Sequence, residues 1–466
     1  MNEPQAIMSK DFHNPEYAQI VADVKRVLEK WILDADFHDA YQQDPDRALA
    51  ETDLDVDPET IKLLLNKDAA KEMITALEEG EIVWDDLPES YRFYKAFMKE
   101  KIAMRERLRN EACVPDEPRF KAWRERQDRR CMLELGSKTL SMIQAPLMFE
   151  LSEGCSVGCP FCAVAAKKLQ GVFRYTEEHA ALWREILQRF HALIGEAAGS
   201  GAIYYDCEGL DNPDYEKFLA DYFAEFGVVP QTTTAASTRN VERTRALLQY
   251  GKENDPHVDR FSVVSPAMRD KVFESFSPEE LLLVELLPQF PEAPECHLIE
   301  VGRNRAEDRE DEVGDTIACI SGFVVNMQEK SVRLMTPFIS DKAHPTGEWV
   351  LEKSSFATAD DLEQAVRRMI AQYMPERLEL DGRCGASCGF RLEEKEGKVW
   401  VHGHGIGVAM MEATIEQDVL DQLVAMLRER KHTGYDILGA LPEDANIAHV
   451  ILLLKALWNH GLVDQL

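Results

Sequence analysis

The sequence predicts an α/β fold: a parallel β-sheet with crossover helices follows a helical domain and precedes an α+β extension with a winged-helix-like end. Three observations predict this class. Apolar residues recur at helical spacing early in the chain, short β-rich runs alternate with helical stretches in the middle, and hairpins and helices follow. The 466 residues, 45% of them hydrophobic, are enough to bury a large core in more than one domain.

An N-terminal helical domain is expected over residues 1–90. The stretches VADVKRVLEKW and PETIKLLLN place apolar residues three to four positions apart, and Asp57-Pro58-Glu59 is typical of a helix start. The segment DPDRALAETDLDVDPETIKLLL also resembles leader peptides related to a small nitrogen-fixation protein, which precede some ribosomally made peptide natural products. The periodicity favours a plain helical domain over that resemblance.

A basic helical linker segment is expected over residues 91–145. From Arg92 to Arg130 the chain carries 13 Lys or Arg against 7 Asp or Glu, although the whole chain is acidic. One interpretation is a salt-bridged surface helix, and the other is a docking surface for an acidic peptide. The aromatic residues interleaved with these charges are Phe93, Tyr94, Phe97, Phe120 and Trp123.

The core is expected over residues 146–340. It alternates β-rich runs with helices such as AALWREILQRFHALIGEAA, which is typical of parallel strands joined by crossover helices. Ser277-Pro278-Glu279-Glu280 predicts a further helix start. The expected strands are 147–151, 202–206, 228–235, 261–265 and 297–301.

Hairpins and helices follow the last of these strands. ISGFVVNMQEKSVRLMTPF predicts a hairpin that turns near residues 328–330. An α+β extension with a thiol loop is expected over 341–410, with a helix at ATADDLEQAVRRMIAQYM and a hairpin at RLEEKEGKVWVHGHG. Residues 411–466 are expected to form the winged-helix-like unit. Its second helix carries only Lys455 and no Arg, which favours a packing or peptide-facing role over reading DNA.

The charge of the chain argues against nucleic acid as a partner. With 84 Asp plus Glu against 53 Lys plus Arg, the formal net charge is -31, which repels phosphate backbones. No stretch approaches the roughly 18 consecutive apolar residues of a membrane span, and the start MNEPQAIMSKDFHNPEY lacks the build of a secretory signal. We therefore expect a cytoplasmic protein with no membrane partner. In that compartment, closely spaced cysteines favour metal binding or thiol chemistry over disulfides.

The strongest motif is CSVGCPFC, residues 155–162, directly after the predicted strand LMFEL. A [4Fe-4S] cubane needs thiolate ligands, and this spacing in a glycine-containing loop lets one short segment bind three irons. A zinc site is the alternative, but zinc would need a fourth nearby Cys or His, and none follows within the loop. We predict that Cys155, Cys159 and Cys162 hold the cluster and leave its fourth iron open.

A second candidate site is YYDCEG, residues 204–209, at the end of the second predicted strand. Open sheets bind ligands beyond the carboxyl ends of their strands, where the carboxylates of Asp206 and Glu208 suit an ammonium group. An ordinary acidic loop is the alternative. By the same positional reasoning, residues after the later strands are candidates to contact ribose, carboxylate or substrate: Thr234, Ser237, Ser265 and the stretch from Glu300 to Asn304.

A third candidate site is RCGASCG, residues 383–389, a loop of small residues far from the cluster motif. Cys384 and Cys388 are expected to be accessible thiols, and the flanking glycines permit close approach of another backbone. Three interpretations stay open: a hydrogen-atom donor, ligands of a second cluster, or plain structure. A second cluster would need about four cysteines, and the cysteines left to complete it are Cys207, Cys296 and Cys319.

The cluster motif resembles that of radical SAM enzymes, which implies a partial (β/α)6 barrel and S-adenosylmethionine as cosubstrate. In that family the open iron binds the amino and carboxylate groups of the cosubstrate. The aromatic residue before the last cysteine, here Phe161, lies against the adenine. The place of YYDCEG usually holds a Gly-Gly-Glu-like segment that receives the methionine amino group. This chain departs from that pattern, so Asp206 and Glu208 both stay candidates.

Several longer segments resemble the radical SAM peptide epimerases that mature proteusin-type ribosomal peptides: FELSEGCSVGCPFC, DCEGLDNPDY, and ISGFVVNMQEKSVRLMTPF followed by HPTGEW. The resemblance implies an isomerase that removes an α-hydrogen from an L-residue of a precursor peptide. A thiol, Cys384 or Cys388, would then donate hydrogen and leave a D-residue. The implied partners are the leader and core of the precursor peptide and a reductase or flavodoxin-type electron donor. The alternatives are a peptide-crosslinking enzyme with a second iron–sulfur cluster and a non-catalytic iron–sulfur partner protein.

Overall fold

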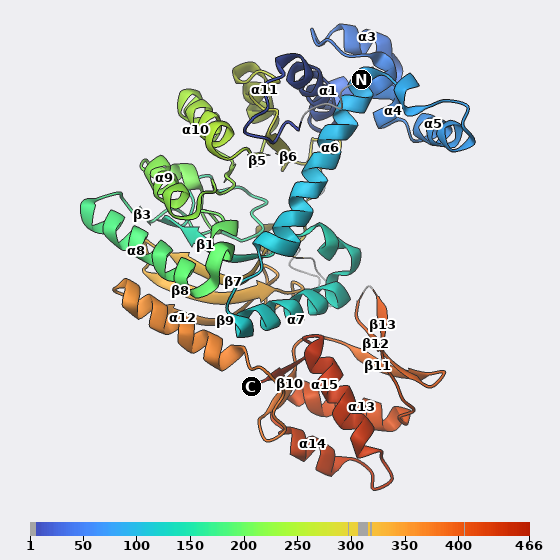
Figure 1. Ribbon diagram of the computed structural model, residues 1–466, viewed down its shortest axis with the longest axis vertical. Helices are drawn as coiled ribbons and strands as arrows, with labels where there is room; N and C mark the ends of the chain where they lie inside the picture. The colour runs from blue at the N-terminus through green and yellow to red at the C-terminus, as the bar shows by residue number, and fades with distance from the viewer. Residues whose placement is uncertain (1–5, 297, 306–315, 317–318, 405) are drawn as a thin grey trace.

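The computed structural model describes residues 6–296, 298–305, 316, 319–404 and 406–466. Within these residues the chain is a mixed α/β protein with several open sheets. The N-terminal helices, the core and a C-terminal unit follow one another along the long axis of the molecule (Figure 1). No helix in the described part of the chain is both long enough and apolar enough to cross a membrane.

The first part of the chain folds into helices, as its periodicity predicts. Asn14 caps the first helix by accepting from the backbone N–H of Tyr17, and Pro15 follows where a missing N–H costs nothing. Asp57 caps the fourth helix in the same way. The helices are α1 (Pro15–Leu33), α2 (Ala35–Gln43), α3 (Pro45–Ala50), α4 (Pro58–Leu65) and α5 (Lys67–Glu79).

Helix α1 joins these helices to the core. Lys25 Nζ donates to the carbonyl oxygen of Leu281 at 2.9 Å, and Arg26 Nη2 donates to that of Phe276 at 3.0 Å. Both cations are buried, so their bonds to carbonyl groups replace the water that they lose. Residues 1–90 are therefore packed onto the core through α1.

The basic segment folds into α6 (Glu89–Arg107) and α7 (Pro118–Leu135). On α7, Arg124 Nη2 donates to the carbonyl oxygen of Gln144 at 2.5 Å, and Arg130 Nη2 donates to that of Pro337 at 2.6 Å. Both arginines are buried. Helix α7 is therefore only in part a salt-bridged surface helix. Arg119 and Arg129 form ion pairs at the surface, whereas Arg124 and Arg130 lie in the interior, where Arg130 also pairs with Glu134.

Parallel strands form the core. Its strands are β1 (Ala145–Glu150), β4 (Thr233–Thr234), β5 (Asp259–Val263), β6 (Val284–Pro288) and β7 (Ile320–Asn326). β7 runs parallel to β1, single bridges join Met148 to Ala202 and Ala202 to Gln231, and β4, β5 and β6 pair in parallel. Six parallel segments thus follow one another in an open row, and no described sheet closes into a barrel.

The expected strands 147–151 and 261–265 match β1 and β5 to within two residues, but others differ. Residues 202–206 contribute only the two bridges of Ala202, and 228–235 only the bridge of Gln231 and the short β4. The strand expected at 297–301 is wrong: residues 298–301 form no strand, and residue 297 lies outside the described residues. β6 completes the row instead. Its sequence VELLP directly follows the apolar run of SPEELLL, so the sequence alone suggests that a helix continues there. The pairing with β5 shows that it is a strand.

The hairpin expected near residues 328–330 is present, and it extends the core sheet past residue 340. β8 (Ser331–Pro337) pairs antiparallel with β7 and with β9 (Glu348–Ser355), giving the order β1-β7-β8-β9. Helix α12 (Ala359–Tyr373) packs against α8 (Glu177–Ile194). The expected boundary at residue 341 is therefore wrong, because β9 and α12 complete the core.

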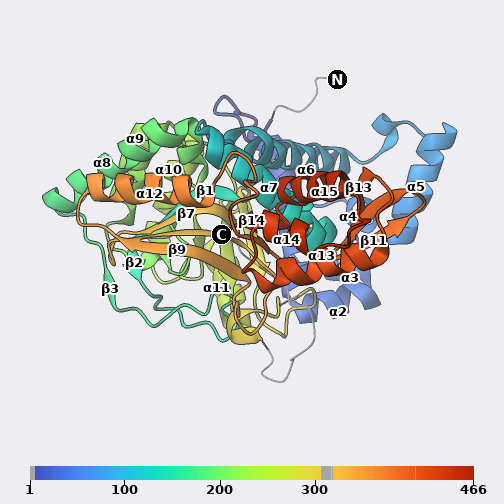
Figure 2. The ribbon, with the colours of Figure 1, turned by 90° about the horizontal axis from the view of Figure 1, so that it is seen from below.

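Helices cover one face of this sheet, and the other face lines the interior of the core (Figure 2). Phe149 and Phe323 pack in a buried cluster with side chains of α7, α8 and α12. Successive side chains of a strand alternate between faces, so Glu150, Asn326 and Arg333 point to the opposite, inner face. The other helices around the core are α9 (Tyr215–Phe226), α10 (Val241–Asn254) and α11 (Pro266–Ser275).

The C-terminal unit has one buried core that runs from residue 378 to residue 463. Its elements are β10 (Cys384–Ala386), β11 (Arg391–Lys395), β12 (Lys398–His402), β13 (Gly407–Glu412), α13 (Gln417–Glu429), α14 (Gly434–Ala440), α15 (Ile447–Asn459) and β14 (Val463–Gln465). β11 and β12 form the expected hairpin. β10 pairs with β14, which ties the start of the unit to its end. The expected boundary at residue 411 is therefore wrong, since it separates paired strands.

Candidate functional site

The three cysteines of the cluster motif lie on one loop beyond the carboxyl end of β1, between β2 (Ser152–Glu153) and β3 (Gly171–Val172). We call residues 154–169 the cysteine loop. Its ends meet at Cys155, whose N–H donates to the carbonyl oxygen of Lys167 at 2.8 Å and whose carbonyl accepts from Leu169 at 3.1 Å. All three thiols are partly exposed. The loop thus presents them at the carboxyl edge of a parallel sheet, where ligands bind in such folds.

The surroundings of the sulfur atoms fit iron ligands. Val157 N–H donates to Cys155 Sγ at 3.4 Å, and Ala166 N–H donates to Cys162 Sγ at 3.3 Å. Burial and the neighbouring thiols of Cys155 and Cys162 raise the pKa of Cys159 to about 11, so the three groups lie within electrostatic reach. Among the described residues, no three metal-binding side chains are close enough to hold a single ion. A cubane does not need that, because its thiolates bind separate irons.

Contacts from two sides hold the cysteine loop. On one side, Asp211 Oδ2 accepts from the N–H of Ser156 at 2.8 Å, and Arg239 Nη1 donates to Asp211 Oδ1 at 2.9 Å. On the other side, Arg303 Nη1 donates to the carbonyl oxygen of Cys159 at 2.9 Å. Arg303 lies in the stretch 300–304 that positional reasoning predicts. The sequence did not predict Asp211 or Arg239, because they anchor backbone and carry no motif spacing. The sequence clue was only their nearness to DCEG and to Ser237.

Two of the predicted cosubstrate residues, Glu208 and Thr234, come together beside this loop, and Ser237 lies three residues after Thr234. The Glu208 carboxylate accepts from Thr234 Oγ1 at 2.6 Å and from the N–H groups of Leu210 at 3.1 Å and Ala235 at 2.9 Å. Glu208 also adds to the raised pKa values of two cluster cysteines, which places it near their sulfur atoms. Ser237 is fully buried, and its Oγ has no hydrogen-bond partner among the described residues.

Asp206 belongs to a different group, which lines a cavity of about 180 Å³ on the inner face of the sheet. Arg333 joins two carboxylates there: Nη1 donates to Asp206 Oδ2 at 2.8 Å, and Nη2 donates to Glu150 Oε2 at 3.1 Å. Asn326 Nδ2 donates to the same Glu150 oxygen at 3.0 Å. Residues 164–167 of the cysteine loop form another wall. We call this space the inner-face cavity.

One carboxylate oxygen of the inner-face cavity lacks a hydrogen-bond partner among the described residues. Burial raises the pKa of Glu150, and Arg333 opposes that rise. Burial and Asp206 likewise raise the pKa of Glu348, which accepts a hydrogen bond from Tyr205 Oη. Asp206 Oδ1 is buried without a hydrogen-bond partner in the described residues. The cavity therefore offers one acceptor that a bound molecule would satisfy.

The predicted thiol pair lies elsewhere and is not accessible. Cys384 is 0% and Cys388 9% exposed, in the core of the C-terminal unit. The predicted exposure is wrong because the small residues around them allow β10 to pack closely against its neighbours. Cys388 contacts Glu134, whose partner Arg130 binds Pro337 at the end of β8. Four residues along a strand separate Pro337 from Arg333 in the inner-face cavity, or about 13 Å.

A different thiol lies beside residues that line the inner-face cavity. Cys207 follows Asp206 in the chain. Burial and Glu150 raise its pKa, and a hydrogen bond with Ser152 opposes only part of that rise. Glu150 and Ser152 both line the inner-face cavity. Among the predicted residues, Cys207 was considered only as a ligand of a second cluster, because sequence spacing does not show what surrounds it.

The remaining predicted residues have other surroundings. Phe161 is half-buried within the cysteine loop. Ser265 caps α11 by accepting from the N–H of Met268 at 3.2 Å, which gives it a structural role. Glu300 is exposed and lies two residues before Gly302. A side chain at Gly302 would come within 2.1 Å of the carbonyl oxygen of Ala163, so this stretch packs against the cysteine loop.

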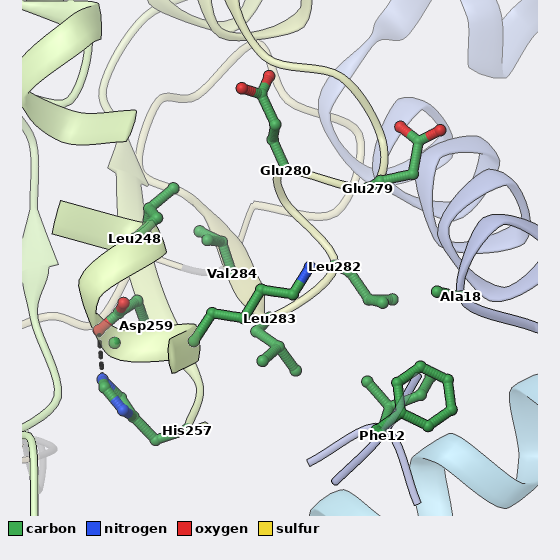
Figure 3. A pocket seen from close by; sticks show the side chains of 13 residues that line it. Phe12, Ala18, Leu248, His257, Asp259, Glu279, Glu280, Leu282, Leu283 and Val284 are labelled. Atoms are coloured by element: carbon green, nitrogen blue, oxygen red, sulfur yellow. Dashed lines mark hydrogen bonds and ion pairs between the residues drawn. The ribbon is translucent and has the colours of Figure 1, made fainter. Parts of the chain in front are cut away.

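A second cavity, of about 60 Å³, lies at the amino ends of β5 and β6 and holds none of the predicted site residues. Its lining is mostly apolar, with Phe12 and Leu282 on one side (Figure 3). On the other side His257 Nε2 lies 3.0 Å from Asp259 Oδ1. The cavity is therefore at the opposite end of these strands from the cysteine loop.

Comparisons with known proteins place the chain near one uncharacterized relative. No protein-family profile matches it. The uncharacterized protein y4wI of Sinorhizobium fredii (strain NBRC 101917 / NGR234) is 34% identical over 382 residues, which span 78% of this chain and 72% of that protein. The crystal structure of BtrN in complex with AdoMet and 2-DOIA covers 41% of this chain and 72% of its own, with 12% identity and a TM-score of 0.29. A TM-score that low carries no weight for fold or function.

Proposed function

The chain belongs to the family of the uncharacterized protein y4wI, and we propose that it is a radical SAM enzyme that epimerises residues of a ribosomally made peptide. The observation that carries the first half is the cysteine loop. Cys155, Cys159 and Cys162 stand together at the carboxyl edge of a parallel sheet, with N–H groups directed at two of the sulfur atoms. The proposal that it epimerises peptide residues rests on the resemblance of the longer sequence segments to radical SAM peptide epimerases.

The three cysteines would hold the [4Fe-4S] cluster, and Glu208 would receive the amino group of S-adenosylmethionine. When bound, this pair of cofactors supplies a 5'-deoxyadenosyl radical that can remove a hydrogen atom from the substrate. Glu208 fits its part because a carboxylate has about four acceptor positions and three of them are occupied. Asp206 is tied to Arg333 and faces the inner-face cavity, so we assign it to the peptide.

The inner-face cavity would orient the peptide backbone. The unpartnered Asp206 Oδ1 can accept from a peptide N–H, and Arg333 keeps that carboxylate in place. Precise orientation matters because the hydrogen atom leaves from one face of a Cα and returns to the other. A site that holds a near-attack geometry supplies this selectivity.

Cys207 would return the hydrogen atom. Its S–H bond breaks as the new C–H bond forms, which leaves a thiyl radical on sulfur and a D-residue in the peptide. One electron and one proton from a cellular reductant restore the thiol. The electron donor is the expected reductase or flavodoxin-type partner. Cys384 and Cys388, which the sequence suggests for this role, are buried in the core of the C-terminal unit.

Anaerobic reconstitution tests the proposed function. We expect about four irons per chain, and release of 5'-deoxyadenosine from S-adenosylmethionine with a strong reductant. A triple Cys155→Ala, Cys159→Ala, Cys162→Ala variant should lose both. Incubation with a candidate precursor peptide in deuterated water should place one deuterium on each inverted Cα.

Other outcomes separate the alternatives. About eight irons per chain and a product with a new crosslink would favour the peptide-crosslinking enzyme. A bound cluster without 5'-deoxyadenosine formation would favour the non-catalytic partner protein. A product of unchanged stereochemistry would contradict the epimerase.

A further inference from the structure

A third cavity, of about 220 Å³, lies where the core meets the C-terminal unit. Trp349 of β9 and Tyr373 of α12 line it from the core, and Trp458 of α15 lines it from the C-terminal unit. Trp349 and Glu348 are neighbours in β9 and so point to opposite faces of the sheet. This space, the aromatic cavity, is therefore separated by the sheet from the inner-face cavity.

Two arginines lie over the aromatic rings of this cavity. The guanidinium carbon of Arg126 is 4.2 Å from the ring centroid of Trp458, and that of Arg430 is 5.8 Å from the centroid of Trp349. Each donates to one backbone carbonyl, Arg126 to Pro375 at 3.3 Å and Arg430 to Ala386. Among the described residues, neither arginine forms an ion pair within 4.0 Å with a carboxylate. This holds even for Arg126, which is buried at 6% exposure and so has little contact with water.

The two guanidinium groups of the aromatic cavity therefore lack a direct carboxylate partner among the described residues. Of its described lining side chains, Asp464 alone is a carboxylate, and burial raises its pKa. Burial lowers the pKa of Arg126 to about 10, a value at which the guanidinium still carries its charge at neutral pH. Leu466, the last residue of the sequence, also lines the cavity, and its α-carboxylate forms no ion pair within 4.0 Å with either arginine. Buried cations of this kind favour a carboxylate ligand in a bidentate arrangement.

We propose that the aromatic cavity binds a segment of the peptide substrate in which an acidic residue lies next to apolar ones. This deepens the proposed function and rests on it for the peptide nature of the ligand. The arginines would pair with the acidic side chain, and the tryptophan and tyrosine rings would cover its apolar neighbours. The volume suits one or two side chains, since pockets for larger ligands start at about 300 Å³. Recognition there would hold the precursor at a place remote from the reacting residue.

Calorimetry with two matched peptides tests this site. The probes are acetyl-Ala-Leu-Glu-Leu-Ala-amide and its counterpart with Gln in place of Glu, titrated into the full chain without S-adenosylmethionine. We expect the Glu peptide to bind about ten-fold more tightly or better, because only its carboxylate can pair with the buried cations. Its affinity should fall as salt is added, which screens ion pairs.

Variants on the two arginines locate the binding. Arg126→Gln and Arg430→Gln should each reduce the preference for Glu over Gln. Lys121→Gln removes the same charge from an exposed position of α7 and should leave the preference unchanged. Circular dichroism checks folding, and Arg430→Gln, whose side chain is less buried, keeps the test valid if Arg126→Gln does not fold.

The outcomes are separable from those of the proposed function. Equal affinity for the two peptides, or a preference that survives both arginine variants, would overturn the site. Binding needs neither cluster nor S-adenosylmethionine, so a chain without 5'-deoxyadenosine formation can still show it. Conversely, an active epimerase that ignores the Glu of the peptide would contradict this site alone.

Discussion

Cys207 lies where burial and Glu150 favour the protonated form of its sulfur. A hydrogen-atom donor must keep its proton, because a thiolate has no hydrogen to give. Ser152 and Glu150 connect the thiol to the inner-face cavity. Burial also raises the pKa values of Cys384 and Cys388. What separates Cys207 from that pair is therefore its position and not its protonation.

Replacing Cys207 with Ala should abolish epimerisation and leave cosubstrate cleavage intact. We expect deuterium incorporation to fall by about 100-fold or more, as when other hydrogen-transferring groups are removed. Release of 5'-deoxyadenosine should persist, because the cluster ligands are unchanged. Mass spectrometry of the peptide and chromatography of the nucleoside measure the two quantities.

Cys384→Ala and Cys388→Ala are the matched controls and should retain incorporation. Loss of incorporation in either control, with full activity in Cys207→Ala, would return the donor role to the thiol loop. Those residues would then have to approach the cavity by a movement of the C-terminal unit.

His257, at the apolar cavity of Figure 3, makes the stability of the fold depend on pH. Burial lowers the pKa of His257, but Asp259 and the backbone of Asp255 outweigh it and raise the value to about 9. The unfolded value is about 6.5. A folded pKa above the unfolded one stabilises the fold fully below about pH 6.5, and this contribution is lost as pH rises to about 9.

The free energy of unfolding should therefore fall by about 3 kcal/mol from this group between pH 6 and pH 9.5. Urea unfolding at the two pH values measures it. In His257→Gln the decrease over this range should be smaller by the same amount. An equal decrease in both proteins would show that the charged form of His257 is not favoured by folding.

At the scale of elements, the cysteine loop depends on the backbone conformation of two glycines. Gly154 has φ of +80° and Gly158 φ of +68°, a region that other residues rarely adopt. They differ in what surrounds them. A Cβ at Gly154 would lie 2.6 Å from the carbonyl oxygen of Lys168, whereas nothing lies within 4 Å of one at Gly158.

Gly154→Ala should therefore disturb the loop far more than Gly158→Ala. Both variants carry the cost of a left-handed alanine, roughly 1 kcal/mol. Only Gly154→Ala also pushes apart the backbone on which Cys155 rests. We expect at least a several-fold loss of iron after reconstitution in Gly154→Ala and near-normal iron in Gly158→Ala, measured by iron assay and visible absorbance. Equal iron contents would contradict the close contact.

Elements with a clear local pattern were predictable, and those defined by pairing were not. The β7–β8 hairpin and the cap at Asp57 follow from local residue preferences. β6 depends on β5 for its hydrogen bonds, and its apolar run by itself resembles a helix. β9 and α12 were assigned to an extension because nothing in their own sequences shows that they join the core sheet.

At the scale of the whole molecule, the proposals place the peptide on two faces of one sheet. The inner-face cavity and the aromatic cavity are separated by the strands β8 and β9, and β9 is the outer strand in the described order. A peptide that fills both would pass around that edge. The C-terminal unit contributes Trp458 and Arg430 to the aromatic cavity, so it would hold the substrate without reaching the reacting residue.

The sequence by itself determined the spacing of Cys155, Cys159 and Cys162, the helical periodicity and the hairpins, because each depends on residues that are neighbours in the chain. Only the tertiary structure decided that Asp206 and Glu208 have different surroundings, and that Cys207 lies beside residues of the inner-face cavity. Arg333 meets Asp206 across 127 residues and Glu150 across 183. Such partners share no local spacing, since they are brought together by strand pairing and burial. For the same reason, the two cysteines in a small-residue loop looked accessible in the sequence and are buried in the fold.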